Sequence, residues 1–316
     1  MLGILHFILL VFILYDAPLT HASTQESDEP HSHQAKRVLV LSGEGTHIMG
    51  VAKILSSLEN ALKSETGEEK NTYSSYDLIV GESMGGVLAL YLAQGKSASN
   101  FIQDVRKAMR DFYSVPRWKK IFNLRGFDTS KYEKALRKLF GEESLDTLLV
   151  PTSITIYDKK YSEYLTISSL DYPDIPIWKA ARAATSSPYW YKPMHLRLNG
   201  IKRDILGHTE NDTNGALITS SLARKIFLKD KLELIRLRAM KDPKALPQNS
   251  LNGMIEQLIK ETGVEDLSIQ VNIPTDLSST DYHDFSIHRN LISGERAIEM
   301  NKEKLLKLFK KISQQE

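Results

Sequence analysis

The chain has 316 residues, of which 41% are hydrophobic and 25% charged, and its formal net charge is +2. This composition is typical of a globular protein that buries a real core, most simply as one domain of enzyme size. The near-neutral charge gives no reason to expect nucleic-acid binding. Because the chain contains no cysteine, disulfides, thiolate metal sites and a cysteine nucleophile are excluded.

An apolar run, Leu2–Tyr15, opens the chain, and the small or polar residues Thr20–Ser23 follow it. This order predicts a secretory signal peptide over residues 1–22, and hence a secreted or exported protein. The alternative is an uncleaved N-terminal membrane anchor, although the run is short for a membrane span. Residues 23–35 are polar and predict a disordered spacer, which leaves 36–312 as the folded domain.

Strand and helix patterns alternate through the rest of the chain. Short aliphatic runs bounded by turn residues predict strands, and apolar residues at helical spacing predict helices. The expected strands are 36–42, 76–80, 150–157, 161–168, 231–237 and 267–273. The expected helices are 47–62, 87–93, 101–112, 131–140, 177–184, 216–227, 251–261 and 295–312. This alternation predicts an α/β fold in which helices cover both faces of a largely parallel sheet.

The most informative motif is Gly81-Glu82-Ser83-Met84-Gly85-Gly86, between the expected strand 76–80 and the expected helix 87–93. A serine between two glycines at a strand-to-helix junction is the layout of a nucleophile elbow. The glycines allow a sharp turn, and the N-terminus of the following helix favours developing negative charge. We therefore predict that Ser83 is a nucleophile.

A glycine-rich loop, Gly43-Glu44-Gly45-Thr46, follows the first expected strand and leads into a helix. A serine hydroxyl attacks a carbonyl efficiently only when a base takes its proton and hydrogen-bond donors stabilise the oxyanion. The backbone N–H groups of this loop are the predicted oxyanion hole. The carboxylate of Glu44 opposes a developing oxyanion unless it points away.

These motifs resemble those of the patatin-like phospholipase family. The family has the order strand, glycine-rich loop, helix and Gly-x-Ser-x-Gly, which appears here at Leu41–Thr46 and Gly81–Gly85. The segment Ala181–Pro188, Ala-Arg-Ala-Ala-Thr-Ser-Ser-Pro, is more specific and is similar to the family's Ala-Arg-Ala-Thr/Ser-Ser-Ala-x-Pro. The resemblance covers roughly residues 36 to 310 and implies a patatin-like three-layer sandwich.

The resemblance also implies a function. Members of the family are acyl hydrolases that cleave carboxylic esters of phospholipids or lysophospholipids with a serine–aspartate dyad and without histidine, metal or cofactor. Ser83 is then the nucleophile, and an aspartate on a later loop is the general base. The expected partner is a lipid substrate at a membrane or micelle surface. Binding of nucleic acid is not expected.

Two aspartates are candidates for the base, because the family's Asp-Gly-Gly sequence is absent here. Asp204 lies at the expected distance from Pro193 but lacks the two glycines that should follow, and we prefer it. Asp212 has turn-forming neighbours, and its simpler interpretation is a helix cap. The family's Gly-Gly-Gly-x-Arg/Lys-Gly loop is altered too, with Glu44 at the central glycine and His47 at the basic position.

Two other interpretations stay open. An α/β-hydrolase with a Ser-Asp-His triad would use a late histidine, His283 or His288. A degenerate relative with weak or no catalysis would bind lipid or a partner protein, and the altered loop and missing Asp-Gly-Gly favour it. The Lys-rich helix 295–312 is expected to dock on the domain with its lysines in solvent, rather than to contact a membrane.

Overall fold

The computed structural model describes residues 35–43, 45–113, 128–187, 191–192, 194–207, 222–223, 225–227, 230–241, 265–274, 276–278 and 283–313. All of them belong to one structural unit, Gln34–Glu316. The expected signal peptide, the helix 251–261 and most of the helix 216–227 lie outside the described residues.

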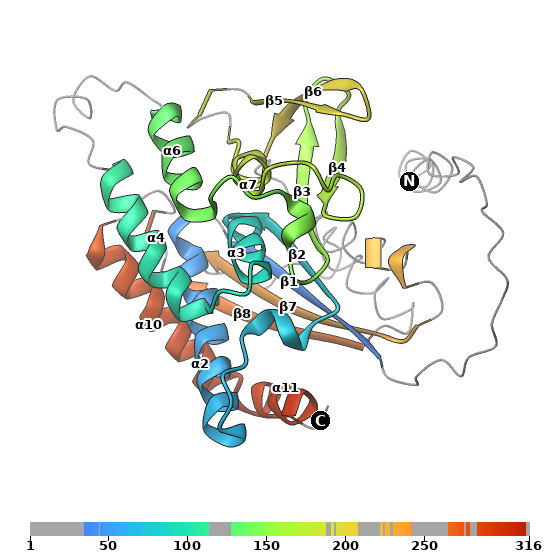
Figure 1. Ribbon diagram of the computed structural model, residues 1–316. Helices are drawn as coiled ribbons and strands as arrows, with labels where there is room; N and C mark the ends of the chain where they lie inside the picture. Colours follow the sequence, from blue (N-terminus) through green and yellow to red (C-terminus); the bar gives the residue numbers. More distant parts are fainter. Residues whose placement is uncertain are drawn as a thin grey trace, which may run out of the picture. The chain divides into compact units, whose positions relative to one another are not determined.

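A mixed sheet of eight described strands forms the centre of this unit (Figure 1). The strands are β1 (Lys36–Gly43), β2 (Leu78–Ser83), β3 (Thr152–Asp158), β4 (Glu163–Ser168), β5 (Met194–Leu198), β6 (Ile201–Leu206), β7 (Leu232–Lys241) and β8 (Glu265–Ile273). Their order is β5-β6-β3-β2-β1-β7-β8, with β4 also beside β3. The strands β3, β2, β1, β7 and β8 are parallel, and the other pairings are antiparallel. The largely parallel α/β architecture is therefore confirmed.

Helices and short helical turns lie between these strands and after the last of them (Figure 1). The α-helices are α2 (Ile48–Thr66), α3 (Met84–Ala93), α4 (Ala98–Tyr113), α6 (Thr129–Phe140), α7 (Ile177–Ala184), α10 (Asp284–Met300) and α11 (Lys302–Ser313). The 3-10 turns are η1 (Gly45–His47), η2 (Thr72–Ser75) and η3 (Leu145–Thr147). α6 begins where the side chain of Asp128 accepts hydrogen bonds from the N–H groups of Ser130 and Lys131, which is a standard N-cap.

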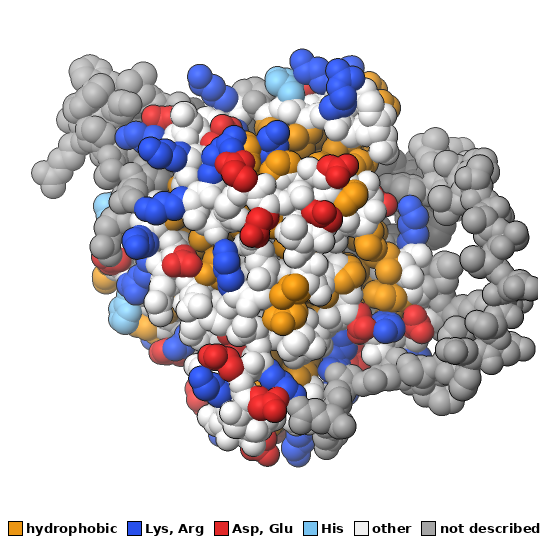
Figure 2. All heavy atoms as spheres, viewed as in Figure 1, with side chains coloured by type: hydrophobic (Ala, Val, Ile, Leu, Met, Phe, Trp, Pro, Cys, Tyr) orange, Lys and Arg blue, Asp and Glu red, His pale blue; other side chains and the backbone are white. Residues whose placement is uncertain are grey.

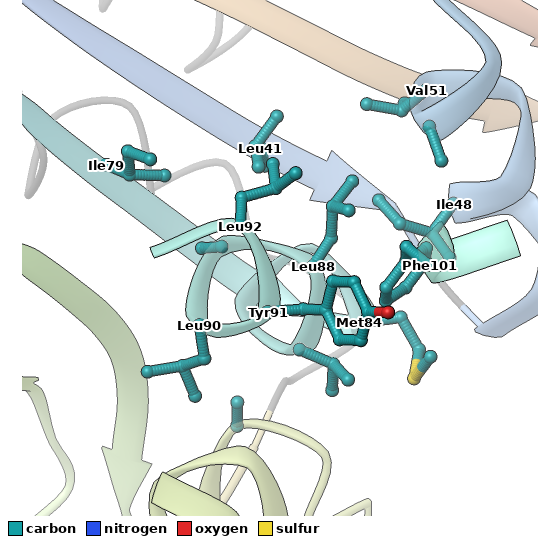
Figure 3. Packing of buried hydrophobic residues seen from close by; sticks show 14 of the residues in the cluster. Leu41, Ile48, Val51, Ile79, Met84, Leu88, Leu90, Tyr91, Leu92 and Phe101 are labelled. Atoms are coloured by element: carbon teal, nitrogen blue, oxygen red, sulfur yellow. The ribbon is translucent and has the colours of Figure 1, made fainter. Parts of the chain in front are cut away.

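The main hydrophobic core lies between the helices and one face of the sheet. Every residue of α3 is buried, as expected for a helix that is apolar on all sides. Figure 3 shows Leu41 and Ile79 of the central strands close to α3, and Tyr91 of α3 beside Phe101 of α4. The rings of Tyr91 and Phe101 meet edge to face, with centroids 5.3 Å apart. This burial anchors the helix that follows Ser83.

The opposite face of the sheet carries a smaller apolar cluster near the start of the strands. Its strand residues are Val38, Val40, Leu78, Val80, Leu232 and Leu234. The residues Leu222, Ala223, Ile226 and Phe227 pack against them. Both faces of the sheet are therefore covered, as expected for strands in a largely parallel sheet.

The structure differs from the sequence prediction in one helix and one hairpin. The expected helix 295–312 is two helices that meet at Asn301, where φ −114° and ψ 24° interrupt the helical backbone. The hairpin of β5 and β6 was not predicted. Asn199 and Gly200 close it with φ of 51° and 77°, the conformation of a two-residue hairpin turn. The Asn-Gly pair is the signal that sequence reasoning missed.

Helix α11 packs against α2 and α10 of the domain. Leu308 and Ile312 are 3% and 5% exposed. Lys311 pairs with Glu233 of β7 and with Glu265 of β8. Among the described residues, no helix combines the length and apolar content that crossing a membrane requires.

Candidate active site

Ser83 ends β2 and immediately precedes α3, in the strand–turn–helix arrangement that the motif predicts. Its backbone has φ 51° and ψ −128°. A non-glycine residue in such a sparsely populated region is strained by about 1–3 kcal/mol and persists only where its surroundings hold it. Ser83 lies at the N-terminus of a buried helix, where free N–H groups favour negative charge.

Gly81 and Gly85 make this turn possible. A Cβ on Gly81 would lie 2.4 Å from the carbonyl oxygen of Gly85, and a Cβ on Gly85 would lie 2.2 Å from the carbonyl oxygen of Leu41. Both distances are too short for any side chain, so the elbow needs glycine at each position. The glycine pattern therefore has a steric cause in this chain.

The glycine-rich loop begins beside the nucleophile. Gly43 and Ser83 are register partners at the ends of the parallel strands β1 and β2, and neighbouring strands lie about 4.8 Å apart. Gly45 has a positive φ of 46°. Thr46 is fully buried, and its hydroxyl donates to the carbonyl oxygen of Ser278 over 3.4 Å. Glu44 lies outside the described residues.

The segment after α7 supports the elbow from the side. Arg182 is 1% exposed, and its guanidinium donates to Oγ of Ser186 over 2.6 Å and to the carbonyl oxygen of Lys192 over 2.8 Å. A Cβ on Gly86 of α3 would lie 3.0 Å from Cβ of Ala184. Small residues thus let α7 approach the elbow helix, and the arginine holds the turn that follows. This packing explains the arginine, the second of the two adjacent alanines and the serine of the Ala-Arg-Ala-Ala-Thr-Ser sequence.

Strands β2 and β6 lie end to end along the same edge of β3, with β6 beyond the elbow, and we call this line of two strands the strand row. Along β3, Thr155 pairs with Glu82 of β2, and two residues later Tyr157 pairs with Leu206 of β6. Both pairings use the same edge of β3, because β4 occupies the other edge at each point. Leu206 is therefore the β6 residue nearest to Ser83 along this row. Sequence reasoning did not identify this position, because it depends on pairing between distant segments.

Gly207 follows β6 and is wedged against the end of α7. Its N–H donates to the carbonyl oxygen of Ser186 over 3.1 Å. A Cβ on Gly207 would lie 2.2 Å from the carbonyl oxygen of Ala184. The chain therefore leaves β6 beside the elbow. The other candidate base, Asp212, lies outside the described residues.

Asp204, the preferred base, lies within β6 and not on the expected loop. Its carbonyl oxygen accepts the N–H of Lys159 over 2.9 Å, which places it roughly 10 Å beyond Ser83 along the strand row. Its carboxylate lies 2.7 Å from Nδ1 of His195 on β5. Within the described residues, the structure brings Ser83 and Gly43 together but shows no hydrogen bond between Ser83 and Asp204.

The two histidines of the triad interpretation lie at the start of α10. His283 precedes its first residue and His288 lies one turn further, and both are exposed. Among the described residues, neither forms a hydrogen bond with the Ser83 hydroxyl.

Three polar residues on neighbouring strands lie side by side next to the elbow. Ser42 of β1 is the register partner of Glu82 on one side and of Arg238 on the other. The hydroxyl of Ser42 donates to the Glu82 carboxylate over 3.3 Å. A carboxylate and a guanidinium therefore both lie near the C-terminal ends of the parallel strands, where ligands of open α/β sheets bind. Within the described part of the chain, no group of three or more acidic or histidine side chains is placed to hold a metal ion.

The fold and this site define an α/β protein built around a strained serine elbow and an adjacent glycine-rich loop. The model of the patatin-like phospholipase family matches residues 39–204, just over half of the chain. The chain belongs to this family.

Individual relatives are distant. The chain is 26% identical to the cGAMP-activated phospholipase of Vibrio cholerae serotype O1 over 182 residues, which cover 52% of this chain and 51% of that protein. It is 23% identical to the probable inactive patatin-like protein 9 of Arabidopsis thaliana over 185 residues, 52% of this chain and 48% of that protein. The chain thus spans about half the length of these relatives. Among solved structures, VipD from Legionella pneumophila aligns with a TM-score of 0.43 and 12% identity, covering 87% of this chain and 67% of VipD.

Proposed function

We propose that this chain is a lipid acyl hydrolase that cleaves carboxylic esters of phospholipids or lysophospholipids with Ser83 as nucleophile. The elbow carries the proposal. Ser83 keeps a strained backbone, φ 51° and ψ −128°, that glycine would adopt freely, and such strain is concentrated at functional positions. Membership of the patatin-like phospholipase family supports a lipid substrate.

In the proposed reaction, Oγ of Ser83 bonds to the ester carbonyl carbon while a base accepts the hydroxyl proton. The N–H groups of the loop Gly43–Thr46 and of the α3 N-terminus stabilise the oxyanion. The alcohol leaves with a proton, and water then hydrolyses the acyl-serine. Asp204 is the predicted base and Asp212 the alternative. For Asp204 to act, its carboxylate has to leave His195 and the β5–β6 hairpin has to move toward the serine.

The test is fatty-acid release from phospholipid and lysophospholipid micelles, together with covalent labelling by a fluorophosphonate probe. We expect the wild-type chain to show both, and Ser83→Ala to lose both with an unchanged circular dichroism spectrum. The matched control is Ser74→Ala, an exposed serine of η2, which keeps both activities. Fatty-acid release by Ser83→Ala at the wild-type rate contradicts the proposal.

A second candidate function, binding of lipid or of a partner protein without hydrolysis, is favoured by two observations. The carboxylate of Asp204 is engaged with His195, and the β6 residue nearest to Ser83 is the apolar Leu206. A protein of this kind leaves Ser83 unlabelled by the fluorophosphonate, and its Ser83→Ala variant binds micelles as the wild type does. Labelling kinetics therefore separate the two candidates.

Export through the signal peptide 1–22 is a further part of the proposal, and it is supported by the apolar run Leu2–Tyr15. Expression of the full chain in a secreting host tests it. The expected result is a mature chain in the medium that begins at Ser23, as read by N-terminal sequencing. A cell-associated chain that keeps Met1 contradicts cleavage and favours the membrane-anchor alternative.

A further inference from the structure

The hairpin of β5 and β6 rises from the same edge of the sheet that carries Ser83. β6 begins at Ile201 and ends at Leu206 in the row of Ser83, so Ile201 lies roughly 20 Å beyond the serine along that row. The turn at the tip is open, because nothing lies within 4 Å of a Cβ placed on Gly200. Figure 1 shows β5 and β6 at the top of the view, beyond the end of β3.

Basic side chains gather on this hairpin and on the adjacent turn between β3 and β4. We define the basic hairpin surface by Lys159, Lys160, Arg197, Lys202 and Arg203. Figure 2 shows Lys and Arg side chains clustered at the top, over β5 and β6. Arg197 and Lys202 are direct partners across the hairpin, and like charges in that position are destabilising.

The acidic groups of the same segments are already occupied. Asp158 and Glu163 both pair with Arg203, and Asp204 pairs with His195. This leaves the other cations of the surface with no acidic partner on these segments.

The lysines Lys159, Lys160 and Lys202 form no ion pair with any described carboxylate. Two lysines of α11 differ, since Lys307 and Lys311 pair with Glu265 and Glu233 at the starts of β8 and β7. The basic hairpin surface therefore carries net positive charge that the described part of the protein does not neutralise.

Two exposed apolar side chains lie among these cations. Ile201 is 42% exposed and Tyr161 is 47% exposed. The guanidinium carbon of Arg203 lies 4.8 Å from the centroid of the Tyr161 ring, and Nζ of Lys160 lies 4.9 Å from it. Cations mixed with an exposed tyrosine and an exposed aliphatic residue match the headgroup region of a bilayer, where ammonium groups meet anionic lipids and tyrosine rings lie at the interface.

We propose that the basic hairpin surface docks the protein on an anionic lipid bilayer, with the edge that carries Ser83 turned toward the lipids. The proposal rests on the proposed function for its purpose, since a lipid hydrolase has to reach its substrate in a bilayer. A different role for the same charges is protection of β5, the outermost described strand on its side of the sheet, against pairing with other chains. That role requires no lipid, so vesicle binding distinguishes the two.

The experiment measures partition onto phosphatidylcholine vesicles with and without phosphatidylserine, in the Ser83→Ala background so that the vesicles stay intact. Each basic residue near an anionic surface strengthens binding about five-fold. The triple variant Lys159→Gln, Lys160→Gln, Lys202→Gln should therefore partition about 100-fold more weakly onto the anionic vesicles. Raising the salt from about 0.1 M to about 0.5 M should weaken the parent chain and have little effect on the triple variant.

The matched control removes the same charge from α11, with Lys302→Gln, Lys304→Gln and Lys310→Gln, and should partition nearly as the parent does. Ile201→Ser should weaken partition at both salt concentrations, because it removes apolar and not electrostatic contact. Equal partition of the two triple variants, or equal binding to neutral and anionic vesicles, overturns the proposal and leaves edge protection as the role of the charges.

A separate readout distinguishes this proposal from the proposed function. When the three lysine substitutions are made in the chain that keeps Ser83, the variant should hydrolyse p-nitrophenyl butyrate, a water-soluble ester, at the wild-type rate. If the wild type hydrolyses neither that ester nor micellar lipid, the proposed function fails while the vesicle result still decides the docking proposal.

Discussion

Gly85, in the first turn of α3, lies directly against the carbonyl oxygen of Leu41 near the end of β1. A Cβ at position 85 would be 2.2 Å from that oxygen and 3.0 Å from the N atom of Ser42. This contact sets the helix that follows Ser83 against the strand that leads into the glycine-rich loop. The two halves of the candidate site are thus joined by backbone contact.

We predict that Gly85→Ala destabilises the fold by about 3 kcal/mol, because the backbone at Leu41 cannot move away without distorting β1. Gly67→Ala is the control. Unlike the helical Gly85, Gly67 has a positive φ, 73°, but nothing lies within 4 Å of its Cβ position, so only about 1 kcal/mol of backbone strain is expected. Urea unfolding measures the free energy of unfolding of both variants. Equal losses would show that the backbone at Leu41 moves away from the new Cβ at little cost.

We predict that Ser83→Gly stabilises the protein while it abolishes hydrolysis. Glycine relieves backbone strain of about 1–3 kcal/mol at Ser83, which exceeds the entropic cost of glycine, about 0.5–1 kcal/mol. A net gain of about 1 kcal/mol in the free energy of unfolding is expected. Ser83→Ala keeps the strain and should leave stability nearly unchanged. Urea unfolding of the three chains decides the matter, and a loss of stability in Ser83→Gly contradicts the strain argument.

The elbow was predictable from the sequence because its causes are local. The strand, the glycines at 81 and 85 and the apolar helix after Ser83 are adjacent in the chain, and each follows from sterics or periodicity. The placement of Asp204 was not predictable in this way. It depends on the pairing of Tyr157 with Leu206, which joins segments far apart in sequence and converts an expected loop into a strand.

We predict that Asp204→Asn lowers fatty-acid release by at least about 100-fold, the scale of a lost general base. Asp212→Asn is the comparison and should retain the wild-type rate. The asparagine of Asp204→Asn can still hydrogen-bond to His195, so the free energy of unfolding should equal that of the wild type. Loss of activity in Asp212→Asn alone assigns the base to the second candidate.

We predict that the carboxyl of Glu59 makes the stability of the fold depend on pH. Burial raises the pKa of its carboxyl above 4.5, although the N–H groups of Thr72 and Ala98 donate to it. The native state therefore holds this proton more tightly than the unfolded chain does. The free energy of unfolding should fall as the pH rises from about 4.5 through the native pKa, and then level off.

Glu59→Gln should remove this slope, because the amide does not titrate. It should also lower stability, since the amide NH₂ group faces the N–H of Ala98. Glu65→Gln, at an exposed position of α2, is the control and should keep the wild-type slope. Urea unfolding between about pH 4 and about pH 8 measures the difference. A Glu59→Gln slope equal to that of the wild type assigns the pH dependence to other groups.

The row shared by β2 and β6 leads to the last prediction. Leu206 is closer to Ser83 than Asp204 is by two residues, about 7 Å along the strand. In the Asp204→Asn background, we expect Leu206→Asp to raise the rates of ester hydrolysis and of fluorophosphonate labelling by at least about 10-fold, because a carboxylate beside the serine can accept its proton.

Leu206→Asn in the same background has a side chain of similar size with no basic oxygen, and it should give no increase. The gain from Leu206→Asp should also depend on pH, since only the ionised carboxylate acts as a base, and should disappear at pH values below its pKa. Equal rates for the two variants, with both folded, would mean that position 206 does not reach Ser83. The position of Leu206 beyond β2 along β3 would then not predict where the general base has to lie.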